Sequence, residues 1–279
     1  MTEQTFIKMH GLGNDFVVFD ARSTPFSLTA TQVRALADRR VGIGCDQLIV
    51  MEAAPDKQAD AFMRIYNADG GEVAACGNAS RCVASLLMAE GASSHTVIET
   101  DAGLLDAEAA PNLMVSVDMG PARLDWRDIP VSAAIDTLHL NLEAGPLKDP
   151  VGVNVGNPHA VFFVDDAEAI PLESVGPVIE TDALFPDFTN VEAAQIIDRN
   201  TIRLRVWERG VGITQACGTG ACATLIAAAR RDLTDRKATV ILDGGPLVIE
   251  WMADNHVMMT GPVATSFRGV VDVDTLGAS

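Results

Sequence analysis

Short apolar segments, some alternating with polar residues and some continuous, recur along the chain and predict β-strands. Clear examples are TFIKMH (5–10), DFVVFD (15–20), HTVIET (95–100), TIRLRVWE (201–208) and PLVIEW (246–251). These segments are rich in β-branched and aromatic residues, and glycine, asparagine and proline separate them, which is typical of strands joined by turns. Strands therefore dominate the predicted fold.

Two longer segments, rich in alanine, predict helices. One follows Cys76 and runs to Gly91, which is a suitable C-cap, and the other follows Cys217. A shorter helix is predicted over residues 29–40, with Thr29 or Thr31 as its N-cap. With one long helix in each half and many strands, the sequence predicts the α+β class with mixed sheets.

The two cysteine-containing segments resemble each other. NADGGEVAACGNASRCVASLLMAE (67–90) aligns without a gap to ERGVGITQACGTGACATLIAAARR (208–231), so that Cys76 matches Cys217 and Asn67 matches Glu208. An ungapped block of this length predicts that the chain contains a duplicated domain.

Two polar positions outside this block repeat at nearly the same spacing. Asn157 lies 143 positions after Asn14, and Asn190 lies 143 positions after Gln47, against 141 positions between the two cysteines. Three matches in the same order strengthen the prediction of a duplication.

The predicted halves are residues 1–119, which carry the first cysteine, and residues 120–279, which carry the second. The boundary is placed near a Gly-Pro pair at 120–121, and the last strand, about 266–273, can return to the N-terminal half.

The composition narrows the class of partner. The chain has 279 residues, 48% of them hydrophobic, and a net charge of −18, because 38 acidic residues oppose 20 basic ones. Proteins that bind nucleic acid or anionic membranes present basic surfaces, so neither partner is expected. No apolar run approaches the roughly 18 residues that span a bilayer, and no signal peptide is visible at the N-terminus.

The cysteine count bears on the compartment of the protein. Five cysteines, an odd number, favour free thiols and a cytoplasmic protein.

Each repeated cysteine stands before a glycine-rich turn at the predicted start of a helix. Unpaired backbone N–H groups and the helix dipole favour negative charge there, so we expect a lowered thiol pKa and a binding site for a carboxylate. If the duplicated halves are related by a pseudo-two-fold axis, Cys76 and Cys217 face each other across a cleft. The amides of Gly77 and Asn78, and of Gly218 and Thr219, then bind a carboxylate between the two helices.

Two opposed thiols suit the inversion of a carbon stereocentre. One thiolate removes the α-proton, the opposing thiol returns a proton to the other face, and the carboxylate takes up the charge that develops. This chemistry needs no cofactor. A pyridoxal phosphate enzyme needs a Schiff-base lysine, and three of the four lysines, all except Lys8, lie in polar, turn-like stretches.

Three other functions are compatible with parts of the sequence: dinucleotide binding, metal binding and thiol redox chemistry. The segment from Gly218 to Ala223 fits a dinucleotide-binding fingerprint, but it does not directly follow its strand. Cys-x2-Cys and His-x3-His spacings are absent from the sequence, so no metal is expected. A thiol redox or binding protein, in which the repeated cysteines cycle through a disulfide, remains an alternative.

Four motifs carry a resemblance to a known family. MHGLGNDF, GIGCDQLIV, YNADGGEVAACGNASRC and ERGVGITQACGTGACA together resemble the diaminopimelate epimerases, from residue 9 to residue 223. The resemblance implies two similar domains, each a mixed sheet wrapped around a central helix. It also implies pyridoxal-independent interconversion of LL- and meso-2,6-diaminoheptanedioate in lysine and peptidoglycan biosynthesis, by a homodimer. Another cofactor-free racemase on this fold, of the proline or hydroxyproline type, is the nearest alternative.

The resemblance implies roles for individual residues. Cys76 and Cys217 resemble the two acid/base groups, and His159 and Glu208 resemble helpers beside the reacting centre. The implied substrate contacts are Asn14, Gln47, Asn67, Asn157, Asn190, Glu208 and Arg209, together with the carboxylate-binding residues Gly77, Asn78, Gly218 and Thr219.

The sequence departs from the family pattern at one position. Ala79 replaces the second glycine of the usual Cys-Gly-Asn-Gly turn, whereas Gly220 keeps it in the second half. An alanine is costly where the backbone needs a positive φ, and it is favourable inside a helix. We expect Ala79 to be helical.

Overall fold

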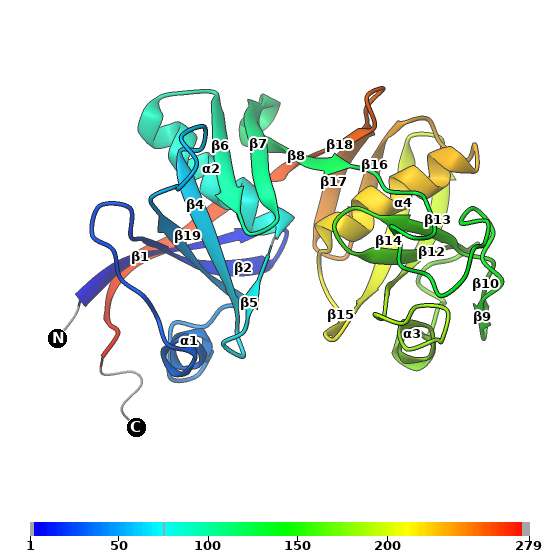
Figure 1. The fold of residues 1–279 in the computed structure, drawn as a ribbon, viewed down its shortest axis with the longest axis horizontal. Coiled ribbons are helices and arrows are strands. Elements are labelled where there is room, and N and C mark those ends of the chain that lie inside the picture. The colour runs from blue at the N-terminus through cyan, green and yellow to red at the C-terminus, as the bar shows by residue number, and fades with distance from the viewer. Residues whose placement is uncertain (1–2, 75, 275–279) are drawn as a thin grey trace. The chain divides into compact units, whose positions relative to one another are not determined.

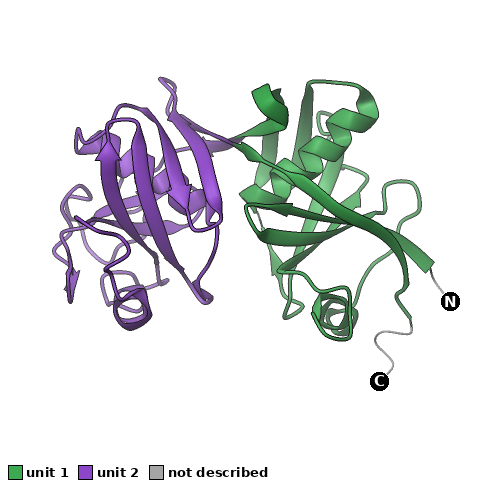
Figure 2. Ribbon diagram, turned by 180° about the vertical axis from the view of Figure 1, so that it is seen from behind, with its two compact units in different colours: residues 1–117, 261–279 green, residues 118–260 purple. Residues whose placement is uncertain are grey.

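The computed structural model describes residues 3–74 and 76–274. The chain divides into two compact units, residues 1–117 with 261–279 (unit 1) and residues 118–260 (unit 2), which are coloured separately in Figure 2. This division falls two residues before the boundary expected at 119/120. It assigns the C-terminal segment to unit 1, because the last strand pairs antiparallel with the first strand of that unit.

Unit 1 consists of strands with two helices (Figure 1). The strands are β1 (Glu3–Gly11), β2 (Asn14–Asp20), β3 (Gln47–Glu52), β4 (Ala61–Asn67), β5 (Glu72–Val73), β6 (His95–Thr100), β7 (Gly103–Ala110), β8 (Met114–Pro121) and β19 (Ala264–Asp272). The helices are α1 (Ala30–Ala37) and α2 (Gly77–Gly91), with a 3-10 turn η1 (Pro111–Leu113). Strand β8 continues past residue 117 into unit 2.

Unit 2 is built in the same way. Its strands are β9 (Glu143–Ala144), β10 (Leu147–Lys148), β11 (Val151–Asn154), β12 (Pro158–Phe163), β13 (Asn190–Asp198), β14 (Thr201–Glu208), β15 (Gly212–Ile213), β16 (Lys237–Leu242), β17 (Gly245–Trp251) and β18 (His256–Pro262). Its helices are α3 (Leu172–Glu180) and α4 (Gly218–Arg230).

Strands β1–β4, β6 and β7 of unit 1 follow the same pairing pattern as β11–β14, β16 and β17 of unit 2. In each unit the first pair is antiparallel, the second parallel and the third antiparallel. The next strand joins the sheet in parallel after the long helix, and an antiparallel hairpin follows. Even the register is repeated, because Phe16 pairs with Gln47 as His159 pairs with Asn190. The predicted duplication thus appears in the strand topology.

The sheet of each unit wraps around one buried helix. Helix α2 packs against β1, β6 and β7, and α4 packs against β11–β14, β16 and β17 (Figure 1). Both helices bury residues on all sides, α4 from Gly220 through Ala228 without interruption, as expected for a helix at the centre of a core. The predicted α+β fold with a central helix in each half is confirmed.

Most predicted elements lie within a few residues of their expected bounds. Helix α1 begins at the predicted Thr29 cap, whose side chain forms a capping box with Gln32. The C-cap of α2 is Ala92 in the left-handed conformation, one residue after the predicted Gly91. Helix α3 was not predicted. Within the described ranges, no helix is long and apolar enough to cross a membrane.

Candidate active site

The two repeated cysteines occupy equivalent backbone positions, one in each unit. Cys76 is the N-cap of α2 with φ −150° and ψ 107°, and Cys217 is the N-cap of α4 with φ −115° and ψ 107°. An extended residue followed at once by a helix leaves the first N–H groups of that helix without helical acceptors. We refer to the predicted site residues of unit 1 as the first half-site (Asn14, Gln47, Asn67, Cys76, Gly77, Asn78) and to those of unit 2 as the second half-site (Asn157, His159, Asn190, Glu208, Arg209, Cys217, Gly218, Thr219).

In the first half-site, two predicted asparagines contact each other. Asn78 donates from Nδ2 to Oδ1 of Asn14 at 3.1 Å, and Asn14 donates from its own Nδ2 to Asp46 at 2.9 Å. The fully buried Arg81 donates to Oδ1 of Asn78 at 2.8 Å. A Cβ atom at Gly11 would lie 3.0 Å from this guanidinium, so glycine there permits the approach. These bonds hold the amides of both asparagines in fixed orientations.

The other two amides of the first half-site form a pair. Gln47 begins β3 and Asn67 ends β4, and the register of these antiparallel strands places the two residues opposite each other. The Gln47 Nε2 donates to Asn67 Oδ1 at 2.9 Å. The Gln47 Oε1 is buried and has no hydrogen-bond partner among the described residues. An unsatisfied buried acceptor of this kind is available to a ligand donor.

In the second half-site, the cysteine sulfur is enclosed by its own turn. The Gly220 N–H donates to the Cys217 Sγ at 3.4 Å, and the Thr219 hydroxyl lies 3.5 Å from the same sulfur. Cys217 is 4% exposed, whereas Cys76 is only partly buried.

The expected lowering of the thiol pKa is wrong for Cys217. Burial, together with the nearby carboxylates of Glu208 and Glu192, raises the pKa of this thiol well above its usual value. The bonds from Thr219 and Gly220 act in the opposite direction and are outweighed. The helix N-terminus therefore does not control this thiol, because desolvation disfavours the thiolate more than the local N–H groups favour it.

His159 contacts two side chains rather than a loop carbonyl. Its Nδ1 lies 2.6 Å from Oε1 of Glu192, and its Nε2 lies 2.9 Å from Oδ1 of Asn157. Both His159 and Glu192 are completely buried. His159 lies on β12, and Glu192 lies on the neighbouring parallel strand β13.

Asn190 and Arg209 are linked through the backbone. The Asn190 amide donates to the carbonyl of Pro158 at 2.9 Å and accepts from the Arg209 N–H at 2.9 Å. The Arg209 guanidinium donates to the Asp187 carbonyl at 2.8 Å. In the part of the chain that the structure describes, no carboxylate forms an ion pair with Arg209, so this exposed charge is available to an anion. Glu208, the preceding residue, accepts from the Thr214 hydroxyl.

Comparison with known proteins identifies the family of the chain. The family model for diaminopimelate epimerase matches residues 6–124 and 151–266. A diaminopimelate epimerase of Rhodospirillum centenum is 57% identical over 274 residues, which cover 98% of this chain and 94% of that protein. One from Erythrobacter litoralis is 57% identical over 269 residues, covering 96% and 97%. The chain belongs to the diaminopimelate epimerase family.

Solved structures outside this family share the fold. A phenazine biosynthesis protein of the PhzF family from Bacillus anthracis has a TM-score of 0.71 at 16% identity, covering 98% of this chain and 100% of that one. A hydroxyproline epimerase from Agrobacterium vitis has a TM-score of 0.66 at 15% identity, covering 99% and 97%. At these identities the likeness concerns the fold alone.

Sequence reasoning missed one residue in this family member that lies against the predicted site. Glu192 interrupts an apolar stretch of β13, NVEAA, and stands two positions after Asn190, on the same face of the strand. A charged residue in a buried strand is a signal that a strand-by-strand reading can find. The equivalent position in the first half, Ile49, is apolar.

The sequence analysis also did not predict the contacts that hold two turns, one between β4 and β5 in unit 1 and one between β14 and β15 in unit 2. In unit 2, Glu180 at the end of α3 accepts from the Trp207 indole at 2.6 Å and from the Gly210 N–H at 2.7 Å. In unit 1, Arg34 of α1 donates to the carbonyl of Asp69 at 3.1 Å. A helix side chain thus fixes the turn beside Arg209 in one unit and the turn beside Asn67 in the other.

The departure at Ala79 has a structural explanation. Ala79 is completely buried inside α2, and neither it nor Gly220 has a positive φ. A Cβ at Gly220 would lie 3.1 Å from Oε1 of Glu192 and 3.3 Å from the Cys217 Sγ. The glycine in unit 2 therefore makes room for a carboxyl group that unit 1 does not have, and the expectation that Ala79 is helical is confirmed.

Several other chemically interesting residues lie outside the two half-sites. Cys45, Cys82 and Cys222 are buried, which is typical of core cysteines. Burial raises the pKa of Cys45 to about 11 and of Cys82 to about 12. Lys8 is bound to Asp15 and to the Gly44 carbonyl.

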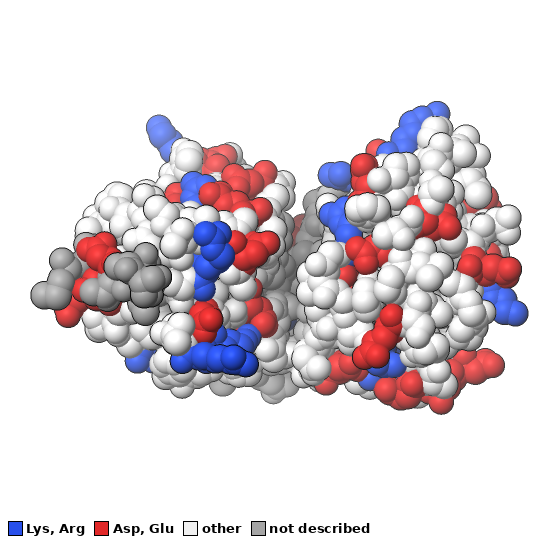
Figure 3. Space-filling view, turned by 90° about the horizontal axis from the view of Figure 1, so that it is seen from below, with Lys and Arg blue, Asp and Glu red and all other residues white. Residues whose placement is uncertain are grey.

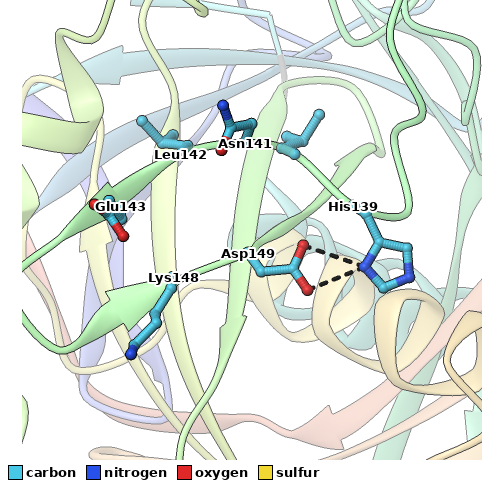
Figure 4. A pocket seen from close by; sticks show the side chains of 7 residues that line it. His139, Asn141, Leu142, Glu143, Lys148 and Asp149 are labelled. Carbon is cyan, nitrogen blue, oxygen red and sulfur yellow. Dashed lines mark hydrogen bonds and ion pairs between the residues drawn. The ribbon is translucent and has the colours of Figure 1, made fainter.

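A surface cavity of about 390 Å³ lies in unit 2, apart from the residues of the second half-site (Figure 4). It is lined by the segment from His139 to Glu143 and by Lys148 and Asp149. The His139 Nδ1 is 3.0 Å from the Asp149 carboxylate. None of the predicted site residues lines this cavity.

Proposed function

We propose that this protein is a cofactor-independent diaminopimelate epimerase in which Cys76 and Cys217 are the two acid/base groups. It converts LL-2,6-diaminoheptanedioate to the meso form, a step of lysine and peptidoglycan biosynthesis. The observation that carries the proposal is the repeated cysteine turn, in which each cysteine is the N-cap of the buried central helix of its unit. Membership of the family supports the choice of substrate.

The mechanism is a proton transfer across one carbon. One sulfur, as thiolate, removes the α-proton, and the other, as thiol, delivers a proton to the opposite face. Since burial and two carboxylates favour the thiol form of Cys217, we assign Cys217 the role of the acid and Cys76 that of the base for the first turnover. The mechanism requires both sulfurs to reach the same carbon.

The remaining predicted residues bind the substrate. The negative charge that develops at the carbon spreads into the α-carboxylate, and the N–H groups after each cysteine, at Gly77–Asn78 and Gly218–Thr219, stabilise it. Arg209 binds the distal carboxylate, which its exposed guanidinium suits. The amides of both half-sites hold the ammonium and carboxylate groups, because an amide both donates and accepts.

We also propose that the enzyme is a cytoplasmic homodimer. Both thiols must be reduced for the proton transfer, and a reducing compartment maintains them. Strand β19 pairs with β1 and exposes Phe267 and Val270, a surface that a second copy can cover. The face drawn in Figure 3 shows widely spread acidic side chains with basic ones in small groups, and together with the net charge this supports the absence of nucleic acid as a partner.

A substrate panel tests the proposal. The purified, reduced protein is incubated without added cofactor with LL-diaminopimelate, L-proline or hydroxyproline, and the stereoisomers are separated by chiral chromatography. We expect the meso isomer to form from LL-diaminopimelate, with no inversion of the other two. Inversion of proline or hydroxyproline alone would replace the proposed substrate, and inactivity that excess reductant leaves unchanged would refute the epimerase.

A further inference from the structure

A carboxyl group without an assigned role lies in the core of unit 2, beside the second half-site. Glu192 is completely buried, and its Oε1 is 2.6 Å from the Nδ1 of His159. Its Oε2 is also buried and has no hydrogen-bond partner among the described residues. Since a buried carboxyl group is costly unless it is well paired, and the equivalent position in unit 1 is Ile49, packing does not explain the residue.

The hydrogen bonds around His159 determine where its protons lie. The Nε2 faces the Asn157 Oδ1 at 2.9 Å, and a carbonyl oxygen can only accept, so Nε2 carries a hydrogen. One further proton lies between Nδ1 and Oε1 of Glu192, whichever of the two atoms holds it. The pair therefore shares one proton in addition to the hydrogen on Nε2, and the contact with Glu192 holds the imidazole ring with Nε2 directed at Asn157.

The hydrogen on His159 Nε2 determines the orientation of the Asn157 amide, and Asn157 is a predicted substrate contact. With Oδ1 of Asn157 occupied by His159, the Asn157 amide nitrogen is directed away from the histidine and can donate to a substrate carboxylate. In unit 1 the equivalent Asn14 is fixed differently, by Asn78 and Asp46. The chain from Glu192 through His159 to Asn157 is thus particular to the second half-site.

The carboxyl group is also close to the second cysteine. A Cβ atom at Gly220 would contact both the Glu192 Oε1 and the Cys217 Sγ, at 3.1 and 3.3 Å. The ionisable groups that face Glu192 are His159 from β12, Glu208 from β14 and Cys217 at the start of α4. Any change in the charge of Glu192 therefore acts on the acid/base group of the reaction.

We propose that Glu192 is a positioning residue, which through His159 fixes the amide of Asn157 and keeps a shared proton beside Cys217. This inference rests on the proposed function. Because Glu192 is completely buried and bonded to His159, its effect is expected in kcat more than in KM.

The first test is a pH titration of the histidine ring nitrogens by ¹⁵N NMR, with the full-length protein. The chain has five histidines, and a His159→Phe variant identifies the signal of His159. In the wild type we expect Nε2 to carry a hydrogen at neutral pH. A wild-type His159 with a bare Nε2 at neutral pH would overturn the inference, even if no variant could be purified.

The second test compares the wild type with Glu192→Gln. The glutamine amide can donate a hydrogen bond to Nδ1 but cannot release a proton, so the variant loses the proton that the pair shares. We expect kcat to fall by about 10- to 100-fold, and we expect the pH dependence of kcat to differ from that of the wild type. Thermal unfolding checks that the variant is folded.

A matched control separates these effects from a general loss of charge. Glu250→Gln removes a carboxylate that lies on β17 and pairs with Lys237 at 2.6 Å, and we expect its kcat to equal that of the wild type. Wild-type kcat and an unchanged pH profile in Glu192→Gln would refute the inference while leaving the epimerase intact. A wild type that fails to epimerise would refute the proposed function, and the NMR titration would still test Glu192.

Discussion

The two cysteine turns of this protein share one backbone geometry but rest on different cores. In unit 1, the paired strands β2 and β3 carry Phe16 and Ile49, which are apolar and buried. In unit 2 the equivalent positions carry His159 and Glu192, which are equally buried but polar and bonded to each other at 2.6 Å. The turn is thus alike in the two units, while the buried side chains at these equivalent strand positions differ.

The two units also differ at the third residue after each cysteine, which is Ala79 in unit 1 and Gly220 in unit 2. Ala79 fills its position beside an apolar core, and Gly220 leaves its position empty beside a carboxyl group. At this position the two units differ by one methyl group, and its absence in unit 2 leaves room for Glu192 beside Cys217. The comparison indicates that the two cysteines lie in chemically different surroundings even though their helices are alike.

The largest effect should come from removing either sulfur. Cys76→Ala and Cys217→Ala are each expected to reduce epimerisation to the background rate, because a thiol is needed on each face of the carbon. Cys222→Ala is the control, since this cysteine lies in the core of α4 and alanine favours helix. Near-native turnover in either of the first two variants would exclude the two-base mechanism.

The second largest loss of activity is expected when the two buried polar residues of unit 2 are replaced by their apolar equivalents from unit 1. We expect His159→Phe/Glu192→Ile to lower kcat/KM by about 100-fold, because Asn157 loses its partner. The free energy of unfolding should stay the same or rise, since apolar replacement of a buried ion pair is often neutral or stabilising by about 1–4 kcal/mol. Urea unfolding and steady-state kinetics measure the two quantities. A variant that loses stability but keeps full activity would show that the His159–Glu192 pair supports the fold and not the reaction.

Substitution of the exposed arginine should affect binding more than turnover. Arg209→Gln is expected to raise KM by about 10- to 100-fold, since a hydrogen bond to a charged group contributes about 1.5–3 kcal/mol. The value of kcat should change less, because the distal carboxylate keeps its charge during the reaction. An unchanged KM would show that another group binds this carboxylate.

Exchanging Gly220 and Ala79, one at a time, tests whether the two cysteine turns differ in their effect on kcat. Gly220→Ala places a methyl group against the Glu192 carboxyl and the Cys217 sulfur, and we expect about 1–3 kcal/mol of destabilisation with lowered kcat. The reciprocal Ala79→Gly should cost about 1 kcal/mol of helix stability and leave kcat close to the wild type. Equal kinetic effects of the two exchanges would contradict the proposed asymmetry.

The smallest effect concerns pH. Because burial raises the pKa of Cys217, alkylation of this residue in a Cys76→Ala background should become fast only above the usual thiol pKa of about 8.5. A raised folded-state pKa means that the folded protein binds the proton more tightly. The contribution of Cys217 to stability is thus complete below pH 8.5 and is lost as the pH rises through its folded pKa. Peptide mass spectrometry follows the alkylation, and a midpoint at or below 8.5 would contradict the assignment.

Much of the fold was readable from the sequence, because local patterns specify it. Alternating apolar positions marked most strands, the Thr29 cap marked α1, and the ungapped cysteine repeat revealed the duplication. Helix α3 was missed because Pro177 lies inside it and no acceptor side chain caps its start. Neither feature is a usual helix signal.

The site was readable only where one segment carries it. The cysteine turns are local, and the structure places both cysteines as helix N-caps. The contact of His159 with Glu192 depends on the parallel pairing of β12 and β13, which are separated by a helix and its loops, and a linear reading does not show it. The pKa of Cys217 was misjudged for a similar reason, since the strands that bury it and the carboxylate of Glu192 come from distant segments.

The most direct test of the central claim is proton NMR of the reduced protein with LL-diaminopimelate in D2O, with no cofactor added and with the two cysteine variants in parallel. The account expects the wild type to form meso product that carries deuterium at the inverted carbon, and expects neither variant to form it. Absence of exchange in the folded, reduced wild type, or formation of deuterated meso product by either variant, would contradict the assignment of Cys76 and Cys217 as the two acid/base groups.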